Sequence, residues 1–103
     1  NAPMAPGSGD DEYRIVFEQT LLPAAERFRP EFILVSAGFD AHADDPLADI
    51  RLSAEGFRFM TRATIGMAER FCHGKMVSLL EGGYEIASLT NCIEIHVREL
   101  LEE

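Results

Sequence analysis

Residues 32–40 read FILVSAGFD, and residues 76–84 read MVSLLEGGY. Each stretch is a short apolar run followed by one or two glycines and then, within two residues, by a polar side chain, Asp40 or Tyr84. A continuous apolar run of this length is typical of a strand that is buried on both faces, as the strands of parallel sheets are. The two stretches therefore predict two strands of a parallel sheet, FILVSAG and MVSLL, each followed by a turn at its carboxyl end.

Helical patterns precede, separate and follow these runs. A first helix is predicted from about Asp11 to Pro30, with a kink at Pro23, which lacks a backbone N–H. Its expected core face consists of Tyr13, Phe17, Leu21, Ala24 and Phe28. A second helix should begin after the N-cap Ser53 and end near Gly74, with a core face of Phe57, Met60, Thr64, Met67 and Phe71. The last helix should bury Ile86, Leu89, Ile93, Val97 and Leu100.

The order helix, strand, helix, strand, helix predicts an α/β fold with parallel strands joined by right-handed crossovers. Strands that are apolar on both faces need further strands and helices around them, and 103 residues do not supply enough. The chain also begins with Asn in a loop rich in Pro and Gly. We therefore expect the end of a domain and not a whole one.

Composition excludes several kinds of partner. The chain has 9 basic and 18 acidic residues, a net charge of −9, and no cluster of Lys and Arg that could bind a phosphate backbone. No apolar stretch approaches the roughly 20 residues that span a bilayer, and no signal peptide is recognisable. Cys72 and Cys92 form no CxxC pair and are expected to be buried thiols in a reducing compartment. We expect a cytoplasmic protein, or a nuclear one in a eukaryote, that contacts neither nucleic acid nor membrane.

The candidate chemistry lies at the strand ends, where open α/β sheets bind ligands. Asp40 follows the first strand and could ligate a metal, although from spacing alone a capping role is the commoner outcome. His42 could chelate beside it or lie in a solvent-exposed loop. Asp44 and Asp45 precede a proline and are interpreted as turn residues.

The second strand ends in the turn Gly82–Gly83, which lets the backbone approach a ligand closely or simply leads into the helix. A phosphate site is disfavoured there by the acidic Glu85. Tyr84 could donate a hydrogen bond to a developing oxyanion, or it could only pack. A zinc site made of Cys72, Cys92 and histidines is disfavoured because the spacing matches no compact finger, so His73 and His96 are expected to be surface residues.

Three segments together resemble a known family. The stretch SAGFDAHADDPL (36–47), the later LLEGGY (79–84) and the opening NAPMAPGSGDDEY (1–13) resemble the C-terminal part of the histone deacetylase superfamily. The likeness is nearest to its class II-like branch, with bacterial amidohydrolases and acetylpolyamine amidohydrolases. It implies an arginase-like, three-layer α/β fold with a parallel sheet, and hydrolysis of acetyl-lysine or acetylpolyamine amides with one zinc ion.

The resemblance also implies roles for particular residues. Asp40 matches a zinc ligand, and Tyr84 matches the tyrosine that polarises the acetyl carbonyl. Gly82 and Gly83 match glycines that border the substrate channel, and Leu47 matches a residue at its mouth. His42 inherits no ligand role. A K⁺ ion is a further cofactor that the resemblance allows in the full-length enzyme.

The chain lacks the histidines that the family uses for catalysis and for zinc binding. The family uses a tandem His pair as acid and base and an Asp-x-His pair as further zinc ligands, and no histidine here matches either. A catalytic zinc normally has three protein ligands, and its water needs a proton acceptor. Residues 1–103 are therefore predicted to be a C-terminal fragment of one catalytic domain, inactive alone and completed by the N-terminal part or by another copy.

Two other functions stay open. The apolar strands would also suit a non-catalytic module that docks on a partner chain through its sheet edge. A small flavodoxin-like phosphate binder is the weaker alternative. Among substrates, the apolar Leu47 favours acetyl-lysine or a similar small acylated amine over a polyamine.

Overall fold

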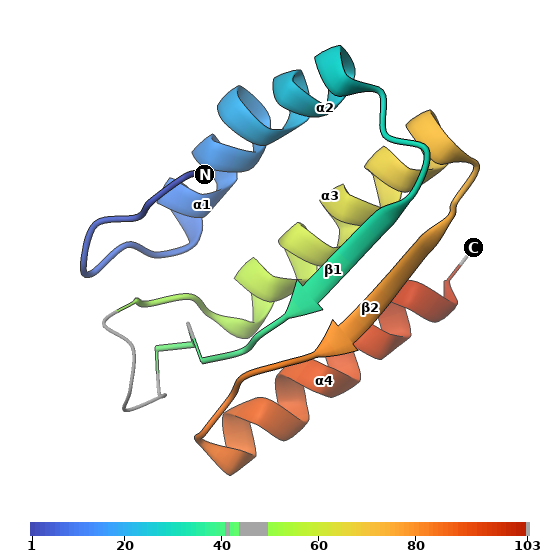
Figure 1. Cartoon of the computed structure of the whole chain (residues 1–103). Coiled ribbons are helices and arrows are strands. Elements are labelled where there is room, and N and C mark those ends of the chain that lie inside the picture. The colour runs from blue at the N-terminus through green and yellow to red at the C-terminus, as the bar shows by residue number, and fades with distance from the viewer. Residues whose placement is uncertain (41, 44–49, 103) are drawn as a thin grey trace.

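The computed structural model describes residues 1–40, 42–43 and 50–102. The elements along the chain are α1 (Asp10–Val16), a π-helical turn η1 (Phe17–Leu21), α2 (Leu22–Phe28), β1 (Ile33–Ala37), α3 (Ala54–Cys72), β2 (Met76–Leu80) and α4 (Ile86–Leu101) (Figure 1). The predicted order of helices and strands is confirmed. None of the described helices combines the length and apolar character needed to cross a membrane.

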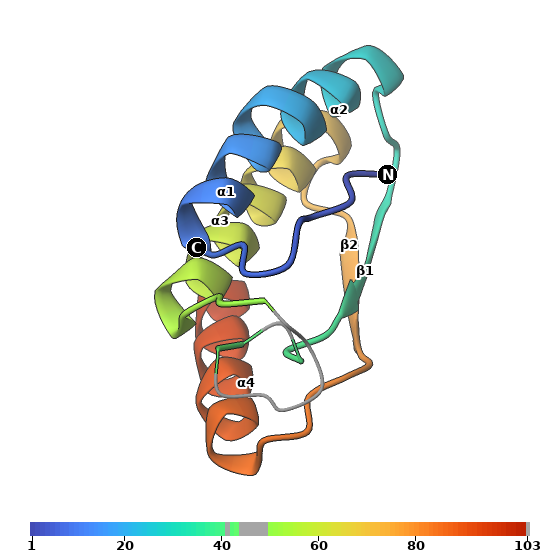
Figure 2. The same ribbon diagram turned by 90° about the vertical axis from the view of Figure 1, so that its left-hand side faces the viewer.

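The two strands pair in parallel, from Ile33 opposite Met76 to Ala37 opposite Leu80. All the helices lie on one side of this pair, as Figure 2 shows. On the other side the side chains of Leu34, Val77 and Leu79 are 70%, 43% and 56% exposed. The described residues thus form two layers, and the strands leave bare the face that we expected to need cover.

The first helical segment contains a π-helical turn that the sequence pattern did not predict. The N–H of Leu22 bonds to the carbonyl of Phe17, five residues back, just before Pro23, which has no N–H to donate. This wider turn moves the inward face from Leu21 to Leu22, which is half-buried beside Phe17. The prediction that Leu21 and Phe28 face a core is therefore wrong, and Phe28 is 80% exposed.

Helix α3 begins and ends where its capping residues predicted. The Ser53 hydroxyl accepts a hydrogen bond from the Gly56 N–H at 3.2 Å, so the predicted N-cap is confirmed. The helix ends at His73 and Gly74, which both have positive φ. Phe57 and Met67 of the predicted core face are buried, and its other members, Met60, Thr64 and Phe71, are half-buried.

Helix α4 confirms only part of its predicted core face: Leu89 and Ile93 are partly buried and pack against the core. Ile86, Val97 and Leu100 are exposed, and the buried residues are Ser88, Cys92, Ile95 and Glu99. The reason is that the polar residues of this face have partners on α3. Both Glu99 oxygens pair with arginines, Oε2 with Arg62 Nε at 2.6 Å and Oε1 with Arg58 Nε at 3.3 Å. Hydropathy alone could not reveal this pairing, which offsets the cost of burying a carboxylate.

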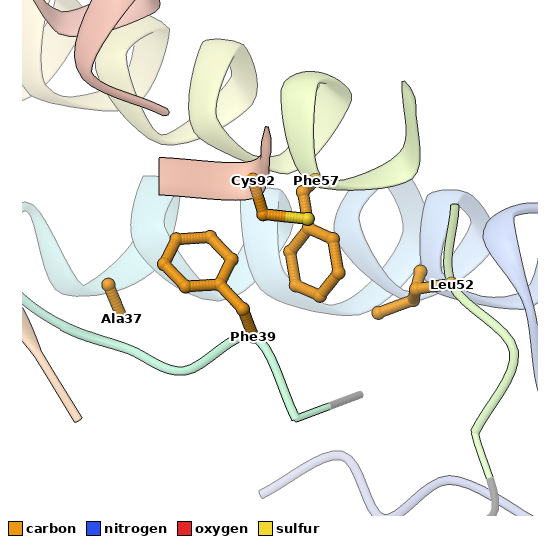
Figure 3. Close-up of a cluster of buried hydrophobic side chains, with 5 residues drawn as sticks. All are labelled: Ala37, Phe39, Leu52, Phe57 and Cys92. Carbon is orange, nitrogen blue, oxygen red and sulfur yellow. The ribbon is translucent and has the colours of Figure 1, made fainter. Parts of the chain in front are cut away.

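A small cluster of buried side chains forms the core where both strands end: Ala37, Phe39, Leu52, Phe57 and Cys92 (Figure 3). The rings of Phe39 and Phe57 lie 5.1 Å apart. Cys92 and Cys72 are both buried and free, as predicted. Burial raises the pKa of the Cys92 thiol to about 11, so this sulfur packs as a neutral apolar group.

His96 is not a surface residue, which corrects one prediction, whereas His73 is exposed as expected. The Thr61 hydroxyl donates to the Phe57 carbonyl, so it accepts from His96 Nδ1–H at 2.8 Å. His96 Nε2 is 2.8 Å from the Ser78 hydroxyl. Burial lowers the pKa of His96 and so favours the neutral imidazole, in which Nε2 accepts a hydrogen bond from Ser78. The ring ties α4 to both α3 and β2.

This geometry predicts an acid-sensitive stability. Burial lowers the pKa of His96, so the unfolded chain takes up a proton before the folded chain does. The stability that neutral His96 contributes is fully present above the ordinary histidine pKa of about 6.5. It is lost as the pH falls through the pKa that His96 has in the folded chain. Urea unfolding between about pH 7 and pH 5 should show a shallower pH dependence for His96→Asn than for the wild type.

His73→Asn removes an exposed histidine and serves as the control, with the wild-type pH dependence expected. Equal slopes for all three proteins would contradict the assignment of a neutral, buried His96.

Candidate active site

The two polar motifs meet at the carboxyl edge of the sheet. Beyond the last paired residues, Glu81 N–H donates to the Ala37 carbonyl at 2.9 Å, and Phe39 N–H donates to the Gly82 carbonyl at 2.7 Å. The strand ladder thus continues into both turns (Figure 1). The expectation that Asp40 and the Gly-Gly-Tyr segment share one edge is confirmed.

Asp40 is half-buried in a notch made by glycine main chain. A Cβ added at Gly82 would lie 3.2 Å from the Asp40 Cγ, and one added at Gly38 would lie 3.1 Å from its Oδ1. A side chain at either position would crowd the carboxylate. No described residue forms a hydrogen bond or an ion pair with this carboxylate, so its oxygens remain available as ligands.

Gly83 is needed for a different reason. Its φ is 145°, and an added Cβ would lie only 2.5 Å from Leu89 Cδ1 and 3.6 Å from Phe39 Cβ. Gly82 thus makes room for Asp40, and Gly83 lets the chain turn closely over Leu89. Both glycines have a packing explanation here, and their role at a substrate channel stays a prediction.

Tyr84 follows directly and is 59% exposed at the same edge. The next residue, Glu85, caps α4 by accepting bonds from the N–H groups of Ser88 at 2.6 Å and Ala87 at 3.4 Å. Hydrogen bonds from Ser88 and Ala87, with a smaller contribution from the charge of His42, hold the pKa of the Glu85 carboxyl below its usual value. The helix start therefore fixes the backbone immediately after Tyr84.

His42 packs against the core cluster. Its ring stacks on Phe57, with the ring centroids 6.4 Å apart and the ring planes within 8° of parallel. The backbone N–H of His42 donates to the Phe39 carbonyl at 3.2 Å. Asp44, Asp45 and Leu47 lie outside the described residues.

Tyr13 feels the charge of Asp40, which the sequence pattern did not reveal. It was placed on a core face, and it does pack against the core cluster from α1. Burial, and then the negative charge of Asp40, raise the pKa of the Tyr13 hydroxyl. The only sequence signal was indirect, since Tyr13 ends the opening segment 1–13 that carries part of the resemblance.

A cavity of about 250 Å³ lies beside β1 and reaches the end of the strand at Gly38 and Phe39. It is lined mainly by apolar side chains from α1, α3 and both strands, including Tyr13, Phe39, Met60 and Met76. Neither Asp40 nor any of residues 82–84 lines it. Its polar groups are hydroxyls and the hydrogen-bonded His96, so we assign it no chemistry.

A metal at this edge would need more ligands than this part of the chain offers. Among residues 1–40, 42–43 and 50–102, no three His, Cys, Asp or Glu side chains come close enough together to hold an ion. Asp40 suits one position of a zinc site, because a carboxylate oxygen is an ordinary zinc ligand.

Comparison with known proteins decides the family. The family model of the histone deacetylase domain matches residues 1–100. The chain belongs to the histone deacetylase family. It is 44% identical over 100 residues to a histone deacetylase-like amidohydrolase of Pseudomonas aeruginosa, covering 97% of this chain and 26% of that protein. It is 42% identical over 103 residues to the chloroplastic histone deacetylase 14 of Arabidopsis thaliana, covering 100% of this chain and 24% of the relative.

Solved structures of histone deacetylases agree with the fold. The HDA15 HD domain superposes with a TM-score of 0.82 at 37% identity, over 94% of this chain and 26% of that one. The histone deacetylase Clr3 superposes with a TM-score of 0.84 at 32% identity, over 94% and 16% of the two chains. The predicted deacetylase-like α/β fold is confirmed, and the chain spans about a quarter of the length of the curated relatives it matches.

The effect of the Asp40 charge on the Tyr13 hydroxyl can be tested directly. The chain has two tyrosines, so in a Tyr84→Phe background the tyrosinate absorbance reports Tyr13 alone. Adding Asp40→Asn should lower the pKa of Tyr13, which stays above its ordinary value because burial, the larger cause, remains. Asp11→Asn, which removes an exposed carboxylate of the same helix, should leave the titration unchanged. An unchanged titration in Asp40→Asn would show that the two side chains are not neighbours.

Proposed function

We propose that this chain is the C-terminal part of a zinc-dependent deacetylase domain and supplies a metal ligand, Asp40, and an oxyanion-stabilising donor, Tyr84. The observation that carries the proposal is the Phe39 N–H to Gly82 carbonyl bond, which holds the two motifs side by side at the carboxyl edge. Relatives named deacetylase or amidohydrolase make amide hydrolysis the reaction class that fits this edge.

Asp40 would hold the zinc ion through its carboxylate, with the other protein ligands coming from outside this chain. When bound, zinc supplies Lewis-acid polarisation of the amide carbonyl and lowers the pKa of a bound water. The glycine notch of Gly38 and Gly82 keeps the Asp40 carboxylate at the sheet edge without a competing protein partner.

Tyr84 would act on the carbonyl oxygen of the substrate. Its hydroxyl would donate a hydrogen bond whose strength grows as negative charge develops on that oxygen. The main chain of Gly82 and Gly83 would border the acyl-lysine channel, and Leu47 would lie at its mouth. The capped start of α4 supports this role, because it restrains the backbone immediately after Tyr84.

The proton transfers would need a base from outside this chain. His96 is hydrogen-bonded in the interior, His73 is exposed at the opposite end of α3, and His42 stacks on Phe57. None of these histidines is set up to accept a proton from a water beside Asp40. We therefore propose that the 103 residues alone are inactive and act once the rest of the domain is present.

The substrate we propose is acetyl-lysine or a similar small acylated amine. An apolar Leu47 suits an apolar acyl chain better than a polycation, and the net charge of −9 would still attract basic substrates. The same charge and the scattered basic residues argue against direct contact with nucleic acid. We also propose that the protein is located in the cytoplasm, or in the nucleus of a eukaryote.

A non-catalytic docking module is the second candidate. The observation in its favour is the bare apolar face of the strand pair, with Leu34, Val77 and Leu79 exposed. Such a module would form a stable dimer or a complex with a partner and bind no zinc. Sedimentation analysis of the chain, alone and with the remaining part of the domain, would show which complexes form. The zinc content of those complexes would separate the two functions, since only the first requires zinc uptake.

Loss of the Tyr84 hydroxyl should affect turnover more than binding. In an enzyme assembled from this chain and the rest of the domain, Tyr84→Phe should lower kcat by about 10²–10³-fold on an acetyl-lysine peptide, with KM changed far less. Zinc content is the control and should stay at the wild-type level. Equal losses in kcat and in substrate affinity would contradict the role proposed for this hydroxyl.

Loss of the Asp40 carboxylate should instead remove the metal. Asp40→Asn in the same assembled enzyme should weaken zinc binding by more than the 10- to 100-fold typical of outer ligand contacts, because a direct ligand is lost. Competition with a chromophoric chelator measures this affinity. Asp11→Asn is the matched control, and an unchanged zinc affinity in Asp40→Asn would exclude Asp40 as a ligand.

A further inference from the structure

Asp10 connects two segments that are far apart in the sequence. Its carboxylate oxygen Oδ1 accepts from the Ser53 N–H at 2.8 Å, and Oδ2 accepts from the Ser53 hydroxyl. Asp10 is the first residue of α1, and Ser53 is the N-cap of α3. One carboxylate therefore satisfies two donors at the point where α3 begins.

The residues before Asp10 strengthen this joint. The Arg51 N–H donates to the Ser8 carbonyl at 2.7 Å, and Gly9 forms a parallel bridge with Arg51. Ser8 is itself buried, with its hydroxyl bonded to the Ala5 carbonyl at 2.6 Å. Residues 8–10 thus lie against residues 51–53, and we name this joint the clasp.

The clasp is connected through Leu52 to His42 and Ala43, which follow Asp40 closely in the sequence. Leu52, at its centre, is fully buried, and its carbonyl accepts from the Ala43 N–H at 2.9 Å. Leu52 also forms a parallel bridge with His42, whose N–H bonds to the Phe39 carbonyl. An unbroken set of main-chain contacts therefore runs from the clasp to the turn that contains Asp40.

The space for the Asp10 carboxylate is provided by Gly56 in the first turn of α3. A Cβ added at Gly56 would lie 2.1 Å from Asp10 Oδ1, whereas one added at Gly66 in the same helix would meet nothing within 4 Å. The first turn of α3 therefore accommodates this carboxylate only because residue 56 is glycine.

We propose that Asp10 is a positioning residue for the active site: by holding Ser53, it fixes the turn that presents Asp40 at the sheet edge. The proposal rests on the metal-ligand role proposed above for Asp40. A carboxylate suits the position because Ser53 offers two donors and Asp10 two acceptors. Asparagine would place an N–H₂ group against one of these donors.

The first readout uses the 103-residue chain without metal. In Asp10→Asn, hydrogen exchange of the Ala43 and Arg51 amides should speed up at least tenfold, while the amides of Cys92 and Ile95 in α4 keep their wild-type rates. Asp11→Asn is the matched control and should change none of these rates. Unchanged exchange at Ala43 in Asp10→Asn would overturn the proposal.

The second readout is zinc affinity in the enzyme assembled with the rest of the domain. Asp10→Asn should weaken zinc binding by about 10-fold or more, the effect of losing an outer contact that orients a ligand. Faster exchange at Ala43 with wild-type zinc affinity would overturn the positioning role. A wild-type affinity in Asp40→Asn as well would instead show that the metal-ligand assignment itself has failed.

A second variant covers the case in which Asp10→Asn does not fold. Gly56→Ala keeps Asp10 but pushes its carboxylate away from the helix, so it should raise exchange at Ala43 and weaken zinc binding in the same direction. Gly66→Ala makes the same change at an open position of α3 and should do neither. Identical behaviour of the two alanine variants in both readouts would overturn the proposal.

Discussion

The structure depends on the parallel ladder between β1 and β2 and on its continuation past the strand ends. The bonds from Glu81 N–H to the Ala37 carbonyl and from Phe39 N–H to the Gly82 carbonyl join the two turns directly. Phe39 then enters the core cluster while Asp40, the next residue, is held at the edge. A continuous main-chain ladder places chemically useful side chains more firmly than free loops could, since its hydrogen bonds restrain both turns at once.

Polar groups with partners decide how the helices pack around this ladder. Glu99 pairs with two arginines, His96 bridges Thr61 and Ser78, and Asp10 holds Ser53. Each of these three side chains meets complementary polar groups, which offsets the cost of removing it from water. The helices therefore dock through specific polar contacts as much as through apolar surface.

The apolar surface left exposed fits a chain that matches about a quarter of its relatives' length. One face of the strand pair is bare, and the exposed side of α4 carries Ile86, Val97 and Leu100. Large exposed apolar areas of this kind mark contacts with other protein. The edge that carries Asp40 and Tyr84 fits the same view, because no three described His, Cys, Asp or Glu side chains come close enough together there to hold an ion.

The sequence by itself determined the order of the elements, both strands, the Ser53 cap and the family resemblance carried by the segments around Asp40 and Tyr84. These features depend on local periodicity and on short motifs, which neighbouring residues specify. Only the tertiary structure decided that α4 buries Glu99 and bonds His96 to Thr61 and Ser78, that Leu22 and not Leu21 turns inward at η1, and that Asp10 bonds to Ser53. Each of those outcomes depends on hydrogen bonds, charges or packing between residues distant in the chain, and hydropathy patterns contain no information about such partners.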